Sequence, residues 1–148
     1  ARAGRKKDDA IYEDEVVEVF IDADGDGRTY NELEVSPANI QFDAQFAAYR
    51  SDLKAALPWD SQMQSAVKLD GTLSKSSDTD KGWFAELSFP ISRLAAVPRP
   101  PKKGERWRFN LFRIDMKNRA GTWDGAALSP PMRGDFHAVE RFAWLELE

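Results

Sequence analysis

The run from Asp22 to Gly27, DADGDG, has the residue types and spacing most suggestive of chemistry. Three aspartates at alternating positions followed by glycine match the start of a calcium-binding loop, in which carboxylate oxygens hold the ion. The match is incomplete, because Leu33 occupies the twelfth position, where an EF-hand loop has a glutamate. The same residues are typical of a tight turn, since Asp-Gly readily adopts positive φ. We favour the turn and keep Asp22, Asp24 and Asp26 as candidate calcium ligands.

Glutamates on predicted strands could share one face of a sheet: Glu18, Glu32, Glu34 and Glu86. A glycosidase needs two carboxylates at a defined separation across a cleft. No acid and base pair is identifiable among these four, and alternating acids are typical of the solvated face of a sandwich. The absence of cysteine excludes thiolate chemistry, and a single histidine leaves little material for histidine-based catalysis. We therefore expect no catalytic residues.

The composition is typical of one globular domain. The 148 residues are 42% hydrophobic and 31% charged, and the formal net charge is -4. This acidic balance disfavours a nucleic-acid partner, which usually requires a clustered basic surface. The sequence has no apolar run long enough for a membrane helix and no signal peptide, so we expect no membrane association and any export signal to lie outside this sequence.

Alternation of apolar and polar residues predicts a series of strands. Residues 15–21 and 29–36 form the clearest hairpin, because they flank the aspartate-glycine turn. Further strands are expected at 39–43, 67–74, 82–90, 106–116 and 142–148. The remaining segments are expected to be a flexible lead-in (1–10), an irregular connection with helical spacing (44–65) and a long loop (117–136). This pattern indicates a single all-β domain over residues 1–148, an antiparallel β-sandwich of jelly-roll or immunoglobulin-like type.

Glu18 is the one polar interruption within the largely apolar strand at 15–21. A carboxylate in such a position needs a partner. Arg108, Asn110 or Arg113 could provide one from a neighbouring strand, and a buried pair of this kind can be purely structural. Glu18 is therefore predicted to form a structural pair, to bind a ligand, or to do both.

Several sequence landmarks occur together in an order that resembles a known family. They are EVVEVFID, YNELEVSP, GWFAELSFPISRL, GERWRFNLFRID, LSPP and ERFAWLEL, and they extend over about residues 8–147. The chain is similar in these landmarks to the family 9 carbohydrate-binding modules and their family 9-like relatives. The resemblance implies a β-sandwich that binds sugar without catalysis, in a secreted bacterial protein with an extracellular or periplasmic location.

The resemblance also implies which residues hold the sugar. In these modules two aromatic rings sandwich the sugar, and a glutamate six residues after the first ring bonds its hydroxyls. This spacing assigns Tyr12 and Glu18, and the loop before the last strand supplies Trp123 as the second ring. Arg113 and Asn118 are candidate polar helpers. The implied partner is a glucan or xylan type of carbohydrate, and calcium is an implied cofactor.

Other positions are also affected by the resemblance. The strand after the acidic turn departs from the family, because it has Asn31, Glu32 and Glu34 where the family has a basic residue. We therefore expect the sugar affinity to be weak, altered or lost. His137 belongs to a phenylalanine-histidine step that the resemblance implies to be a hydrogen-bonded loop anchor. The tryptophans at alternating strand positions are predicted to be core residues: Trp83, Trp107 and Trp144.

Family members have further strands before the aspartate-rich segment, and none precedes Ala1 in this sequence. An incomplete sandwich exposes an unpaired edge. We therefore expect a partner chain or a neighbouring copy to supply the missing strands. Two functions compete at this point: a non-catalytic carbohydrate-binding module, and a structural or assembly protein whose sugar site has degenerated.

Overall fold

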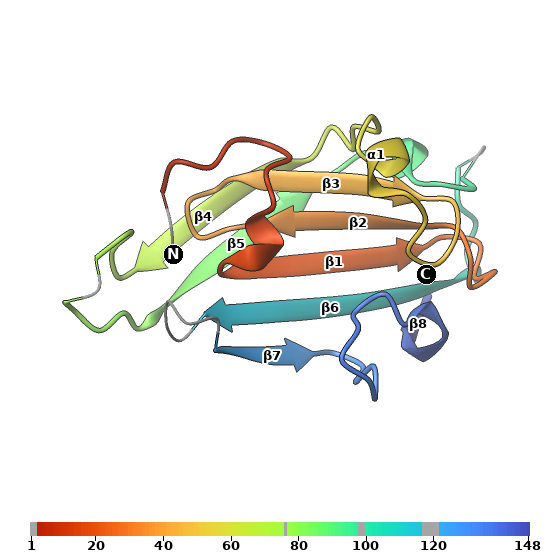
Figure 1. Ribbon diagram of the computed structural model, residues 1–148. Coiled ribbons are helices and arrows are strands. Elements are labelled where there is room, and N and C mark those ends of the chain that lie inside the picture. Colours follow the sequence, from red (N-terminus) through yellow and green to blue (C-terminus); the bar gives the residue numbers. More distant parts are fainter. Residues whose placement is uncertain (1–2, 76, 98–99, 117–121) are drawn as a thin grey trace.

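The larger sheet organises the fold. The computed structural model describes residues 3–75, 77–97, 100–116 and 122–148. In this part of the chain, the larger sheet has six antiparallel strands: five follow the order β3-β2-β1-β6-β7, and the sixth, β8, pairs with the other end of β6 (Figure 1). The strands are β1 (Val16–Asp22), β2 (Tyr30–Val35), β3 (Gln41–Phe46), β6 (Arg106–Met116), β7 (Trp123–Ala127) and β8 (Ala143–Glu146).

The β1–β2 hairpin is the predicted one, and β1 lies at the centre of the sheet. Glu18 is opposite Glu34 on one side and opposite Phe112 of β6 on the other. Nearly every residue of β1 and β2 is buried. This burial explains why both faces of β1 are largely apolar in sequence.

A second, two-stranded antiparallel sheet covers one face of the larger sheet. It consists of β4 (Gln64–Asp70) and β5 (Gly82–Ser88). Leu87 and the following Phe89 pack against a cluster that includes Val19, Leu33 and Trp107. These antiparallel sheets confirm the predicted fold class, a mainly β protein with a single domain.

Short turns and loops, rather than strands, cover the opposite face of the larger sheet. They include two 3-10 turns, η1 (Ile11–Glu13) and η3 (Val139–Arg141). Phe20 is fully buried on this face and makes edge contacts with Phe112 and His137. Polar side chains that point to this face of the larger sheet are therefore covered by the same turns and loops.

Helix contributes little to the described part of the chain. The single α-helix there, α1 (Leu53–Ala56), is one turn long, and η2 (Ile91–Arg93) follows β5. Asp52 caps α1 by accepting a hydrogen bond from the Lys54 backbone N–H. No helix among the described residues has both the length and the apolar character that crossing a membrane requires.

β7 was not predicted, because it lies in a segment interpreted as loop. It pairs with β6, with Trp123 opposite Met116. The predicted flexible lead-in is also partly anchored, since the Asp8 backbone N–H donates to the carbonyl oxygen of Gln41 on β3. Both features depend on pairing with residues that are distant in sequence.

The three strand tryptophans have different environments. Trp107 is buried, as predicted, and Trp83 is half-buried. The prediction for Trp144 is wrong, because this ring is 47% exposed. The guanidinium groups of Arg106 and Arg108 lie over it at 4.7 and 4.5 Å from the ring centroid. Cation–π contacts of this kind stabilise an aromatic ring at the surface.

Candidate ligand-binding pocket

A pocket of about 440 Å³ opens on the face of the larger sheet that lacks a second sheet. Its volume is within the range of roughly 300–1,000 Å³ that is usual for small-molecule sites. Side chains of the strands form its base, among them Glu18, Glu32 and Ile114. Residues of η1, β7 and two loops (50–53 and 134–137) form the remaining walls.

Aromatic rings from separate segments line this pocket. Tyr12 of η1 contacts Phe42 edge to face at 5.5 Å between ring centroids. Trp123 of β7 is 48% exposed and contacts Phe136 edge to face at 6.1 Å. Phe136 is in turn stacked on Phe112 at 4.2 Å. Packing against fixed neighbours limits ring motion, which favours binding of a rigid ligand.

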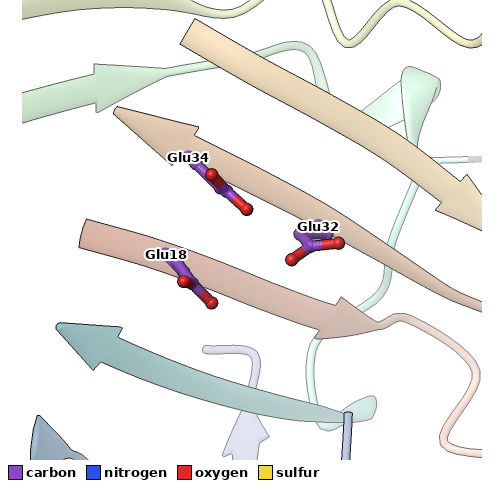
Figure 2. Close-up of side chains that lie close together, drawn as sticks. All are labelled: Glu18, Glu32 and Glu34. Atoms are coloured by element: carbon purple, nitrogen blue, oxygen red, sulfur yellow. The ribbon is translucent and has the colours of Figure 1, made fainter. Parts of the chain in front are cut away.

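Three glutamates from β1 and β2 lie beside one another at the base of the pocket (Figure 2). Glu18, Glu32 and Glu34 are 2%, 5% and 0% exposed. One carboxylate oxygen from each lies within 4.8 Å of one from each of the others. The expectation that these residues form a solvated face is therefore wrong, because η1 and the loops cover the face that they share.

Burial raises the pKa values of all three carboxyl groups. The pKa of Glu32 rises from 4.5 to about 7. The pKa values of Glu18 and Glu34 lie well above the usual value, because the negative charges of neighbouring glutamates add to the effect of burial. At neutral pH the cluster must therefore either retain protons or gain positive charge from a ligand.

The cationic side chain that lines the pocket, Arg50, is bonded to an acid outside the glutamate cluster. Its Nη2 donates to Asp135 Oδ1 at 2.7 Å, and the Tyr49 hydroxyl donates to the other oxygen of Asp135. Partial burial disfavours the charge of Asp135, but these hydrogen bonds outweigh it and lower its pKa. Arg50 therefore neutralises Asp135 at the rim.

His137 is a structural anchor, as predicted. Its Nδ1 lies 2.7 Å from the Tyr30 hydroxyl oxygen, within hydrogen-bond distance, and its backbone N–H donates to Asp135 at 3.0 Å. Burial, together with the charge of Arg50, lowers the pKa of His137 to about 4. The imidazole is therefore neutral at neutral pH and supplies no charge to the glutamates.

The structure brings three of the predicted ligand-binding residues together and separates a fourth. Tyr12, Glu18 and Trp123 all line the pocket. Arg113 is on the opposite face of β6, where its Nη2 donates to Asp115 at 2.8 Å. Asn118 lies outside the described residues.

The structure gives other partners to the residues proposed to pair with Glu18. Arg108 donates to backbone carbonyls of Gly25 and Glu140, and the Asn110 amide donates to the Ser129 carbonyl. Arg113, as noted, bonds Asp115. The expectation that Glu18 forms a structural pair with one of these residues is therefore wrong for the described part of the chain, because each of them bonds other groups.

Sequence reasoning missed Arg50, Asp135 and Phe136 as lining residues. All three lie in segments interpreted as irregular connection or loop, where no periodicity indicates which way a side chain points. The one usable signal was that Phe136 directly precedes His137 in the phenylalanine-histidine step. Glu86, which was grouped with the other glutamates, is exposed on β5 in the second sheet.

The aspartate loop forms the predicted turn between β1 and β2. Both oxygens of Asp22 accept backbone N–H groups, from Gly25 and Gly27, each at 2.8 Å. Carboxylate oxygens of Asp22, Asp24 and Asp26 also lie within 4.8 Å of one another, so the loop could offer three oxygens to a cation. Calcium binding by this loop stays a prediction.

We expect Asp22→Ala to lower the free energy of unfolding by about 1 kcal/mol, because it removes the acceptors for two loop N–H groups. The decrease in the free energy of unfolding is small for two reasons. The loop is only partly buried, and the substitution also removes a carboxyl group whose charge is unfavourable, since burial raises its pKa to about 6. Urea denaturation measures the change. Asp24→Ala is the control, since its side chain is exposed and accepts one backbone N–H group, that of Asp26, at 3.2 Å. Equal effects of the two substitutions would contradict the role given to Asp22.

Comparison with known proteins finds similarity both in sequence and in structure. An "Extracellular protein" of the fungus Arthroderma benhamiae is 31% identical over 142 residues, which is 93% of this chain and 63% of that protein. A crystal structure of a Bacteroides uniformis protein, to which carbohydrate binding is provisionally ascribed, matches 97% of this chain and 65% of that chain with a TM-score of 0.68 at 17% identity. This second likeness shows a shared fold.

The chain thus spans less than two thirds of the length of either protein. No family model matches it, so membership of the family 9 modules stays a prediction, as does a bacterial origin.

Proposed function

We propose that this chain is a non-catalytic carbohydrate-binding domain that holds a sugar between Tyr12 and Trp123, with Glu18 bonding its hydroxyl groups. One observation carries the proposal: these three residues, from η1, β1 and β7, line a single pocket. The Bacteroides uniformis protein of the same fold, provisionally described as carbohydrate-binding, supports it.

The chemistry of the pocket suits a sugar. Aromatic faces pack against the C–H groups of a pyranose ring, while carboxylate and guanidinium groups bond its hydroxyls. Glu18 and Glu32 offer acceptors at the base, and Arg50 offers donors at the rim. A pocket of about 440 Å³ suits a small saccharide or one end of a glucan or xylan chain.

A binding role fits the acids better than hydrolysis does. A glycosidase places its two carboxyl groups on either side of the scissile bond. The three glutamates here lie on one sheet face, with oxygens within 4.8 Å of one another. Release of reducing sugar from the bound glycan, abolished by Glu18→Gln together with Glu32→Gln, would contradict a purely binding role.

We also propose an extracellular location. The Arthroderma benhamiae relative, similar over 93% of this chain, bears the name "Extracellular protein". Secretion would bring the pocket to environmental polysaccharides. Detection of the full-length protein in culture medium, rather than in the cell fraction, would test this location.

We expect Trp123→Ala to weaken glycan binding about tenfold or more, because truncation of a central aromatic side chain costs on the order of 2 kcal/mol. Isothermal titration against glucose, cellobiose, xylan and unrelated glycans measures the effect. Trp144→Ala is the matched control, since this tryptophan is 47% exposed, against 48% for Trp123, but lies outside the pocket. Equal losses in the two variants would contradict the assignment of the site.

The competing function is structural or assembly, with a degenerate sugar site completed by a partner strand. Absence of binding across the whole glycan panel would favour it. In that case the prediction of a partner chain or a neighbouring copy could be tested by measuring the oligomeric state in solution.

A further inference from the structure

The three buried glutamates present a charge problem that the sugar proposal does not solve. Sugar hydroxyls are neutral, whereas three carboxylates at one place repel one another in a poorly solvated environment. In the described part of the chain, no lysine or arginine forms an ion pair with Glu18, Glu32 or Glu34, and Arg50 is paired with Asp135. Among the described residues, the cluster therefore has no ion-paired cation, and the charge of Arg50 acts on Glu32 without an ion pair.

Glu34 is the member of the cluster whose negative charge is the least compensated by its surroundings. Its side chain has no solvent exposure, and neither carboxylate oxygen accepts a hydrogen bond from an N–H group of the described residues; the carboxyl group of Glu32 is close enough to share a proton with it. Figure 2 shows its carboxyl group beside those of Glu18 and Glu32. Buried carboxylates without donors are rare in proteins, and a bound ion is one of the physical explanations for them.

We propose that Glu18, Glu32 and Glu34 bind a calcium ion at the base of the pocket. Calcium takes six to eight oxygen ligands at roughly 2.3–2.6 Å, so ligand oxygens can lie up to about 5 Å apart across the ion. The oxygens of these three residues lie within 4.8 Å of one another, which satisfies this limit. Three carboxylates, each bound through one or two oxygens, supply three to six ligands.

Calcium fits this donor set better than the common alternatives. Zinc prefers histidine and cysteine, and the cluster contains only carboxylates. Magnesium requires near-octahedral geometry and usually keeps several waters, which a largely buried cluster does not favour. Calcium tolerates irregular coordination by carboxylates.

The position of the cluster connects the ion to the pocket. Glu18 and Glu32 line the pocket, whereas Glu34 is fully enclosed. An ion held by all three residues therefore has its open coordination positions on the pocket side. These positions would accept sugar hydroxyls, so the ion would bridge the protein and the glycan; this last step rests on the proposed function.

This site is separate from the aspartate loop. The carboxylates of Asp22, Asp24 and Asp26 form their own group at the β1–β2 turn, and oxygens of Asp22 and Asp26 accept hydrogen bonds from backbone N–H groups of the turn. The glutamates lie within the strands, and neither oxygen of Glu34 accepts a backbone N–H group from the described part of the chain. Substitutions can therefore distinguish the two groups.

Isothermal titration of the chelator-treated protein with calcium, without sugar and near pH 7.5, tests the proposal. We expect saturable binding that Glu34→Gln weakens at least tenfold and that Asp24→Asn leaves within about twofold. Magnesium at the same concentration should not displace the calcium. Absence of calcium binding, or binding lost in Asp24→Asn and kept in Glu34→Gln, would overturn it. Stabilisation by glucosamine without any calcium binding would also overturn it, in favour of an ammonium ligand.

A second titration, with glycan, separates this proposal from the proposed function. We expect glycan affinity to fall at least tenfold when calcium is replaced by chelator. Calcium binding with no glycan binding would keep the cation site and reject the sugar site. Glycan binding that chelator leaves unchanged would keep the sugar site and reject the bridging ion.

Discussion

In the presence of a chelator, the free energy of unfolding should fall by about 2 kcal/mol or more as the pH rises from about 5 to about 7, which lies between the unfolded and folded pKa values of Glu32. Burial raises the pKa of Glu32 from 4.5 to about 7 and holds those of Glu18 and Glu34 well above their usual value. The folded state therefore binds more protons than the unfolded state in this range, so stability decreases with pH. Urea denaturation at each pH measures the decrease.

Three other titratable groups at the pocket do not change charge between pH 5 and 7. Tyr12 has a raised pKa and stays protonated, Asp135 has a lowered pKa and stays charged, and Arg50 stays cationic. His137, with a folded pKa of about 4, makes stability rise with pH between that value and about 6.5 and so offsets part of the fall. Asp22, whose pKa burial raises to about 6, adds to the fall below pH 6.

Two controls assign the pH effect to the cluster. Replacing all three glutamates with glutamine should flatten the profile, because the groups that lose protons are gone. Saturating calcium should flatten the profile of the unmodified protein, since the ion binds the charged carboxylates and compensates their repulsion. A chelated protein whose stability is constant or rises over this pH range would refute the assignment.

Local patterns were sufficient for most of the strands. The segment 106–116 coincides with β6, and the aspartate-glycine turn identified the β1–β2 hairpin, because both signals lie within a short stretch of sequence. β7 was missed, because its sequence, WDGAA, has weak alternation and its pairing partner on β6 is known only from the folded chain. Pairing between distant segments leaves little local trace.

Only part of the candidate site could be predicted from the sequence. Tyr12, Glu18 and Trp123 were chosen from a resemblance in which landmarks keep their order along the chain, and all three line the pocket. The burial of Glu32 and Glu34 was not predicted, since alternating acids on a strand usually face solvent. Whether they do depends on η1 and the loops, whose positions no periodic pattern specifies.

Glu34→Gln should raise the free energy of unfolding of the chelated protein by about 1–3 kcal/mol near pH 8, which is a gain of roughly 2–4 °C in Tm per kcal/mol. Glu34 is fully buried, with no donor to either oxygen, so its charge is unfavourable without a cation. Glutamine keeps the shape, removes the charge and supplies N–H donors to Glu18 and Glu32. Denaturation in chelator, compared with the unmodified protein, measures the gain.

Glu86→Gln is the matched control for this substitution, because Glu86 is exposed on β5 and its replacement should change stability by less than about 0.5 kcal/mol. Calcium should then make the unmodified protein more stable than Glu34→Gln, which is the reverse of their order of stability in chelator. At a calcium concentration 100 times its Kd, the unmodified protein gains about 2.7 kcal/mol, whereas Glu34→Gln gains much less. A loss of stability in Glu34→Gln under chelator would mean that the Glu34 carboxyl is already satisfied in the absence of an ion, and would remove the physical reason for a cation at the base of the pocket.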